Sequence, residues 1–94
     1  MHLEEGITRR VLGQVHLARR ELTQAEQELR GSLHILEELN SRYETAKTCF
    51  QLARLHWTRG ERAPMEENLS QARATFEKLG ARLDLAQAQE LAPE

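Results

Sequence analysis

The feature that most constrains the fold is an internal repeat with a period of forty residues. A shift of the chain against itself by that period aligns identical residues from end to end without a gap: Leu12 with Leu52, His16 with His56, Glu21 with Glu61, Leu29 with Leu69, Glu37 with Glu77, Leu39 with Leu79, Arg42 with Arg82, and Ala46 with Ala86. One register held over the whole chain is typical of a repeated supersecondary unit. The sequence therefore predicts stacked copies of one unit.

The unit itself is predicted to be helical. Ala, Leu, Glu, Gln and Arg are abundant, prolines number only two, and long alternating β-branched runs are absent. We predict an all-α fold in which antiparallel helix-turn-helix repeats stack as a short α-α superhelix of about five helices. A single domain is expected, with one repeat over residues 2–40, a second over 42–80, and a capping helix or partial third repeat over 82–92.

Helix boundaries in the first unit follow from capping patterns. A first helix is expected from about His2 to about Arg20. The capping-box spacing of Thr23 and Glu26 predicts a second helix that begins near Thr23, and Asn40 is suited to the left-handed conformation that ends it. Spacings of three and four predict one continuous apolar face on the first helix, made of Leu3, Ile7, Val11, Leu12, Val15, Leu17 and Ala18.

The second unit carries equivalent signals. Ser41 and Glu44 repeat the capping-box spacing and predict the start of a third helix, which should stop at Gly60. Pro64 is expected in the first turn of a fourth helix that ends at Gly80. The third helix carries Ala46, Cys49, Phe50, Leu52, Ala53, His56 and Trp57, and the fourth is predicted to bury a stripe of Met65, Leu69, Ala72, Phe76 and Leu79.

Charge and hydropathy exclude several classes of partner. The net charge is -2, and the 13 basic and 15 acidic residues are intermixed, so no field of one sign favours nucleic acid or an anionic membrane. No apolar run approaches the length of a membrane span, and the N-terminal residues lack the apolar core of a secretory signal. We expect a soluble, cytoplasmic protein.

The sequence indicates no enzyme, no cofactor and no metal site. Phosphate-binding glycine loops, serine-nucleophile turns and helix-borne metalloprotease motifs are all absent. Cys49 falls on a buried stripe and is expected to be a small core residue. His16 and His56 are the basis of an alternative metal-binding or small-ligand function, but two histidines without further ligands favour a packing role instead.

The repeated residues resemble the tetratricopeptide repeat, a helix-turn-helix unit of protein-binding scaffolds. The matching positions are Leu52, Ala53, His56, Gly60, Met65, Leu69 and Ala72 in one unit, and Leu12, Gly13, His16, Arg20, Ala25, Leu29 and Ser32 in the other. Small residues at these positions let the paired helices approach closely. The chain departs from the family where histidine replaces an aromatic residue, where Met65 replaces a smaller one, and in its period of forty rather than about thirty-four.

Units of this length that end in a phrase like Phe76–Arg82 resemble the repeats of large bacterial signalling ATPases and transcriptional activators. The resemblance implies that the 94 residues form the end of a sensor or scaffold array, with residues 91–94 as a natural terminus.

The resemblance also implies a binding groove, because the first helices of successive family units line the concave face. The matching candidate residues here are Arg10, Gln14, Leu17, Lys47, Phe50, Arg54, Trp57 and Gln87. Arginine binds carboxylates in bidentate fashion and aromatic rings cover apolar side chains, so a protein or peptide partner with acidic groups is expected. Trp57 has an alternative role as a core residue between repeats.

A structural function is the alternative to groove binding. Leu3 and Ile7 lie on the terminal helix, which should be more polar if it faces water. This pattern favours self-association, with a homodimer formed through the end helices.

Overall fold

The computed structural model describes residues 2–91, 89% helical and without strands in that range, which confirms the all-α prediction. Its five helices are α1 (His2–Ala18), α2 (Leu22–Glu38), α3 (Arg42–Arg59), α4 (Arg62–Leu79) and α5 (Arg82–Leu91). Helices α1 and α2 pair as the first unit, α3 and α4 pair as the second, and α5 begins a third copy. The predicted end of the last helix at residue 92 lies outside the described residues, as do the last three residues of the expected terminus.

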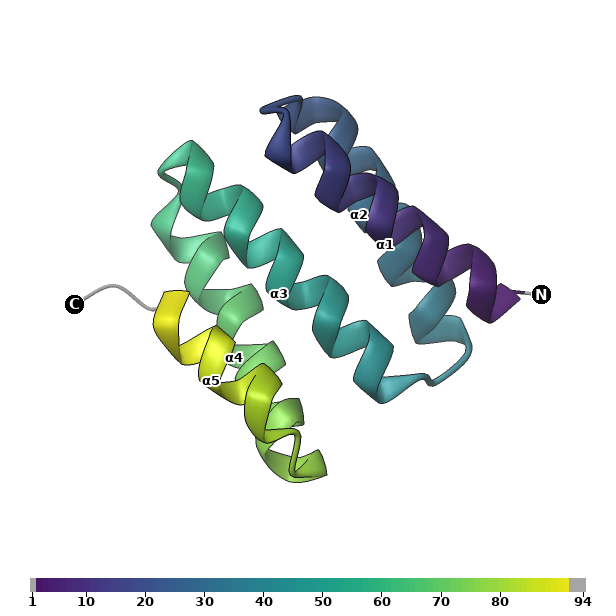
Figure 1. Cartoon of the computed structure of the whole chain (residues 1–94), viewed down its shortest axis with the longest axis vertical. Coiled ribbons are helices and arrows are strands. Elements are labelled where there is room, and N and C mark those ends of the chain that lie inside the picture. The colour runs from purple at the N-terminus through teal and green to yellow at the C-terminus, as the bar shows by residue number, and fades with distance from the viewer. Residues whose placement is uncertain (1, 92–94) are drawn as a thin grey trace.

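The helices form two layers in a body of 40 × 32 × 19 Å. Figure 1 shows α3 running between α1 and α5 in the layer nearer the viewer, with α2 and α4 behind them. The first helices of successive units also contact each other directly, α1 with α3 and α3 with α5. The layer of first helices therefore presents one continuous face of the stack.

Small residues set the distance between the two helices of the first unit. A Cβ atom at Gly6 would lie 2.7 Å from Leu36, and one at Gly13 would lie 2.7 Å from Leu29. Both distances are too short for a side chain, so α1 and α2 pack closely through these glycines. The close approach predicted at Gly13 is confirmed, and Gly6 adds a second contact that the sequence pattern did not single out.

All four helix ends between the elements use a residue with a left-handed backbone. Gly60 and Gly80 have φ values of 74° and 70°, and the positions forty residues earlier, Arg20 and Asn40, have values of 64° and 54°. The predicted helix ends at Asn40, Gly60 and Gly80 are confirmed. Since glycine adopts this conformation without steric cost and arginine does not, Arg20 makes the first turn the strained member of the set.

The start of α2 differs from the prediction. Residue Glu21 occupies the N-cap position and α2 begins at Leu22, so the expected capping box of Thr23 and Glu26 is wrong. The reason is a tight turn: α1 ends at Ala18, and the backbone N–H of Glu21 already bonds to the carbonyl oxygen of His16 at 2.9 Å. Thr23 is consequently an exposed residue inside the first turn of α2.

The start of α3 agrees with the prediction in position and differs from it in the side-chain contacts. Ser41 occupies the N-cap position, as predicted, but makes no side-chain capping bond. Glu44 forms an ion pair with Arg10 of α1 instead. Pro64 lies in the first turn of α4, which begins two residues earlier at Arg62.

The apolar face predicted for α1 is divided in the structure. Leu17 is buried with Gly6, Arg10 and Gly13, which together form the packing face of the helix. The other large apolar residues of the predicted stripe are half-buried or exposed: Ile7 is half-buried, and Leu3, Val11, Leu12 and Val15 are exposed. The predicted apolar face is not buried as a whole, because the glycines, which carry no hydrophobic signal, form the closest contact with α2.

Candidate binding groove

A groove runs along the layer of first helices and is formed by three adjoining hollows. The middle hollow, of about 450 Å³, lies between α1, α3 and α5 and is lined by Gln14, Phe50, Gln51, Arg54, Gln87, Glu90 and Leu91. A second hollow shares Gln14, Phe50, Gln51 and Gln87 with it, and a third shares Arg54 and Leu91. The shared walls make one elongated depression across the three helices.

All eight residues predicted for the groove line these hollows: Arg10, Gln14, Leu17, Lys47, Phe50, Arg54, Trp57 and Gln87. They come from three helices that are far apart in the sequence, and the forty-residue stacking brings them to one surface. What the groove binds stays a prediction.

One end of the groove has its charges largely paired. Arg10 is 6% exposed and its Nη1 donates to Glu44 Oε1 at 2.5 Å, so this cation is already neutralised. The ammonium of Lys47 lies 5.0 Å from the centre of the Tyr43 ring, and the Tyr43 hydroxyl donates to Asp84 at 2.6 Å. The hydrogen bond to the Asp84 carboxylate, followed by burial, raises the pKa of Tyr43 above its ordinary value.

The other end is cationic and less occupied. Arg54 is exposed, and its Nη1 donates to the neutral amide oxygen of Gln51 at 3.1 Å. Within residues 2–91 no carboxylate lies within ion-pair distance of Arg54 or of Arg20, which lines the same hollow. Glu90 of α5 lines the opposite wall of the middle hollow. Unpaired positive charge is therefore concentrated on the α1–α3 side of this end.

Trp57 lies at the surface and not between the repeats. Its side chain is 49% exposed and lines the hollow that also contains Leu17 and Arg20. The neighbouring residue His56 is buried, so the two adjacent positions on α3 point to different environments. This exposure excludes a core role for Trp57. The ring lines this hollow and also a separate one at the α3–α4 turn, and its part in binding stays a prediction.

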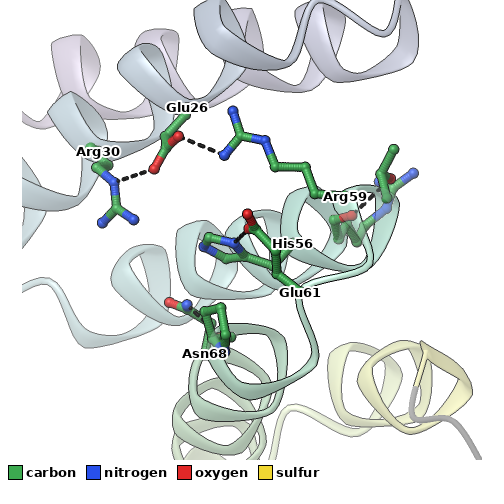
Figure 2. A network of polar contacts seen from close by, with 9 residues as sticks. Glu26, Arg30, His56, Arg59, Glu61 and Asn68 are labelled. Atoms are coloured by element: carbon green, nitrogen blue, oxygen red, sulfur yellow. Dashed lines mark hydrogen bonds and ion pairs between the residues drawn. The ribbon is translucent and has the colours of Figure 1, made fainter.

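The two aligned histidines each bind a glutamate of their own unit. Nδ1 of His16 lies 2.7 Å from Glu21 Oε1, and Nδ1 of His56 lies 2.7 Å from Glu61 Oε1. A carboxylate only accepts hydrogen bonds, so each imidazole Nδ1–H donates. Figure 2 shows the second pair at the α3–α4 turn. The buried Nε2 of His56 has no hydrogen-bond partner among residues 2–91.

This contact joins the end of a first helix to the N-cap residue of the second helix. When the chain is aligned with itself, His16 matches His56 and Glu21 matches Glu61. The five-residue spacing from each histidine to its glutamate was the signal that could have revealed the two contacts. Each imidazole is used inside its own unit, which leaves no shared site between the two. Among residues 2–91 no group of three His, Cys, Asp or Glu side chains is placed to hold a metal ion.

A polar cluster connects the two units on the side away from the groove. Arg59 of α3 donates to Glu26 of α2 at 2.7 Å, and Arg30 donates to the other oxygen of the same carboxylate at 2.8 Å (Figure 2). The hydrogen bond from Arg59, then that from Arg30, holds the pKa of Glu26 below its ordinary value. The bridged carboxylate therefore favours the stacked arrangement of α2 and α3.

Cys49 is buried in the core of the second unit, as predicted for a core residue. Its thiol lies 3.6 Å from the Gln71 amide oxygen. Burial, and to a lesser extent the charge of Glu37, raises the pKa of the thiol to about 11. A neutral, buried thiol is a poor nucleophile.

The helices and the hollows define an all-helical, repeat-like domain with a depression on one face. Neither a protein-family model nor a curated protein nor a solved structure was found to match the chain. No helix within residues 2–91 combines the length and the apolar character needed to cross a membrane.

Proposed function

We propose that this chain is a protein-binding module that holds an extended, acidic segment of a partner in the groove between α1, α3 and α5. The observation that carries the proposal is the convergence of eight residues from three helices on one elongated depression. Grooves of this kind suit extended segments, because the scaffold is rigid and its first helices offer side chains at a regular spacing.

Arg54 is the principal contact for an acidic side chain. Its guanidinium donates to one amide oxygen, a neutral and replaceable partner, and the side chain is exposed. A carboxylate of the ligand would receive a charge-assisted, bidentate contact in its place. Because Glu90 lies on the α5 wall, the ligand's carboxylate should sit on the α1–α3 side, towards Arg20.

Apolar side chains of the ligand would pack against Trp57 and Phe50. Trp57 offers a half-exposed ring at the cationic end, and Phe50 lines both the middle hollow and the far hollow. Aromatic anchors next to an arginine are the residue types that dominate binding energy at interfaces. The proposed ligand therefore alternates acidic and apolar residues.

Arg10 has a different role in this proposal from that of Arg54. Because Glu44 neutralises it and it is nearly buried, Arg10 shapes the groove wall and fixes α1 against α3. Removing it would leave Glu44 without its partner and would disturb the scaffold, so a loss of binding at this position would not identify a ligand contact.

The same proposal gives the chain its wider setting. Groove binding and the residue pattern support a tetratricopeptide-type interaction module without catalysis or cofactor, of the kind found in bacterial signalling proteins and working in the cytoplasm. Its partner is protein, and neither nucleic acid nor membrane, because charges of both signs are intermixed over the surface.

Trp57 is the only tryptophan of the chain, so its fluorescence reports directly on the groove. The experiment titrates the protein with two degenerate pools of short synthetic peptides that share apolar positions and carry either Asp and Glu or Lys and Arg at the others. We expect a saturable fluorescence change with the acidic pool. Arg54→Ala should weaken binding by roughly tenfold or more, since a hydrogen bond to a charged group is lost.

Arg73→Ala is the matched control, because Arg73 is an exposed arginine on α4, outside the three hollows. It should leave affinity unchanged. Equal responses to the two pools, or equal losses from the two substitutions, would contradict the proposal.

A further inference from the structure

The outward face of α1 carries an unpartnered apolar strip. Val11, Leu12 and Val15 are 48%, 43% and 42% exposed, and Thr8 is exposed beside them. Val11, Leu12 and Val15 follow Thr8 by three, four and seven residues, which places all four on one side of the helix, opposite the face formed by Gly6, Arg10, Gly13 and Leu17 that packs inside the unit. We call these four outward residues the α1 strip. None of them lines the three hollows of the groove.

The second unit shows that the fold buries this position when a neighbour is present. The residues forty positions after the strip are Thr48, Gln51, Leu52 and Leu55 of α3, and all four are buried. Leu52 and Leu55 pack with Leu29 of α2, and the Thr48 hydroxyl lies 3.1 Å from the hydroxyl of Ser32. The α1 strip is thus the counterpart of an established helix-packing surface.

Charged residues at the two ends of the α1 strip indicate which kind of partner it binds. Glu4 precedes Thr8 by four residues, and Arg19, in the turn directly after α1, follows Val15 by four. Both are exposed, and the backbone N–H of Arg19 still bonds to the carbonyl oxygen of Val15, which continues the helical spacing of the strip. The set is symmetric about the point between Val11 and Leu12, because Glu4 and Arg19, Thr8 and Val15, and Val11 and Leu12 themselves lie at equal distances from it. A second α1 laid antiparallel across a twofold axis would bring Glu4 of each copy to Arg19 of the other.

We propose that the α1 strip is an interface with a second copy of this chain, formed by antiparallel α1 helices with two symmetric Glu4–Arg19 ion pairs. The interface leaves the groove open, because Gln14 and Leu17 point to a different side of α1. It covers one helix face per copy, which is small for a stable interface, so the dimer dissociates in the micromolar range. The inference is independent of what the groove binds.

Sedimentation equilibrium between about 1 μM and about 1 mM covers the range in which such an interface forms. We expect the mass to rise from 10.8 kDa towards twice that value. Val15→Glu should abolish the rise by placing a charge in the centre of the apolar contact. Because Val15 is exposed in the single chain, circular dichroism and the melting temperature at low concentration should stay unchanged for this variant.

Charge reversal tests the antiparallel register. Glu4→Arg alone and Arg19→Glu alone place like charges together and should each weaken dimerisation by about tenfold, whereas the double variant should restore it. The matched control Arg73→Glu, on α4, should leave it unchanged. A mass of 10.8 kDa at every concentration overturns the interface. A dimer that survives Val15→Glu, or a double variant as weak as the single ones, overturns it as well.

Discussion

The two repeat units have the same register but differ in how their first helices are covered. In the second unit, Leu52 and Leu55 of α3 are buried against α1 and α2, while in the first unit their counterparts Leu12 and Val15 lie at the surface of α1. The histidines follow the same trend, since the His56 side chain is 6% exposed and that of His16 is 28% exposed. Position in the stack, and not residue type, decides which apolar residues form the core.

The units also differ in how they achieve close helix packing. The first unit uses Gly6 and Gly13 where the second has Ala46 and Ala53. Both alanines are buried in a cluster with Phe76, a larger residue than Leu36 at the equivalent position. The first unit therefore depends on backbone proximity, and the second on the volume of its side chains.

The largest expected difference in stability is between alanine substitutions at Leu52 and at its counterpart Leu12. Leu52→Ala removes a fully buried side chain between three helices and should lower the free energy of unfolding by about 3 kcal/mol. Leu12→Ala, at the equivalent but exposed position, should cost less than about 1 kcal/mol. Urea denaturation followed by circular dichroism, at a concentration where the chain is monomeric, measures both. Equal losses would contradict the comparison.

Exchange of the small residues tests the packing difference. Gly13→Ala places a Cβ 2.7 Å from Leu29 and should destabilise the chain by about 1 to 3 kcal/mol, because two helices must move apart. Ala53→Gly, at the equivalent position, should cost about 1 to 2 kcal/mol, through lower helix propensity and the loss of a buried methyl group. The melting temperatures of the two variants show which substitution destabilises the chain more. A neutral or stabilising Gly13→Ala would show that α1 and α2 are not in close contact.

The strained turn offers a stabilising change. Arg20→Gly relieves a left-handed arginine and should raise the free energy of unfolding by about 1 kcal/mol. Gly60→Arg introduces the same strain forty residues later and should lower it by a similar amount. The two turns would prove not to be equivalent if chemical denaturation gave changes of the same sign.

The smallest effect concerns the ion pairs of Glu26 and Glu66. Glu26 joins α2 to α3 through Arg59, whereas its counterpart Glu66 pairs with Arg62 on its own helix. Because the folded pKa of Glu26 is lowered, its stabilisation is fully present above the unfolded value near 4.5 and is lost as pH falls through the folded pKa.

Glu26→Gln should therefore cost less than about 1 kcal/mol at pH 7 and nothing at strongly acidic pH. Glu66→Gln should be nearly neutral throughout. The free energy of unfolding of both variants, measured as a function of pH, tests this prediction. If Glu26→Gln lowers stability by the same amount at acidic pH as at pH 7, the ionised carboxylate of Glu26 is not the source of the stabilisation.

The sequence predicted much of this fold because the repeat encodes it. The number of helices and the turns at Asn40, Gly60 and Gly80 follow from one register and the period of a helix. The candidate groove residues came instead from the resemblance to the tetratricopeptide repeat. The start of α2 was missed because the histidine-to-glutamate contact and the left-handed Arg20 close the turn before the capping pattern begins. Periodicity does not report such local bonds.

The groove chemistry was less predictable than its lining. Arg10, Lys47 and Arg54 are equally cationic in the sequence, but in the structure Glu44 neutralises Arg10, Tyr43 lies under Lys47, and Arg54 contacts only an amide within the described residues. These differences come from residues more than thirty positions away or on the neighbouring turn. A single sequence does not specify which carboxylate pairs with which cation.

The most direct test of the proposed groove is a map of amide chemical-shift changes in the nitrogen-15-labelled protein on addition of a peptide selected from the acidic pool. The account predicts changes concentrated on α1, α3 and α5 around Gln14, Phe50, Arg54, Trp57 and Gln87, with α2 and the outward face of α4 unaffected. Changes confined to α2 and α4, or the absence of any change at saturating peptide, would contradict it.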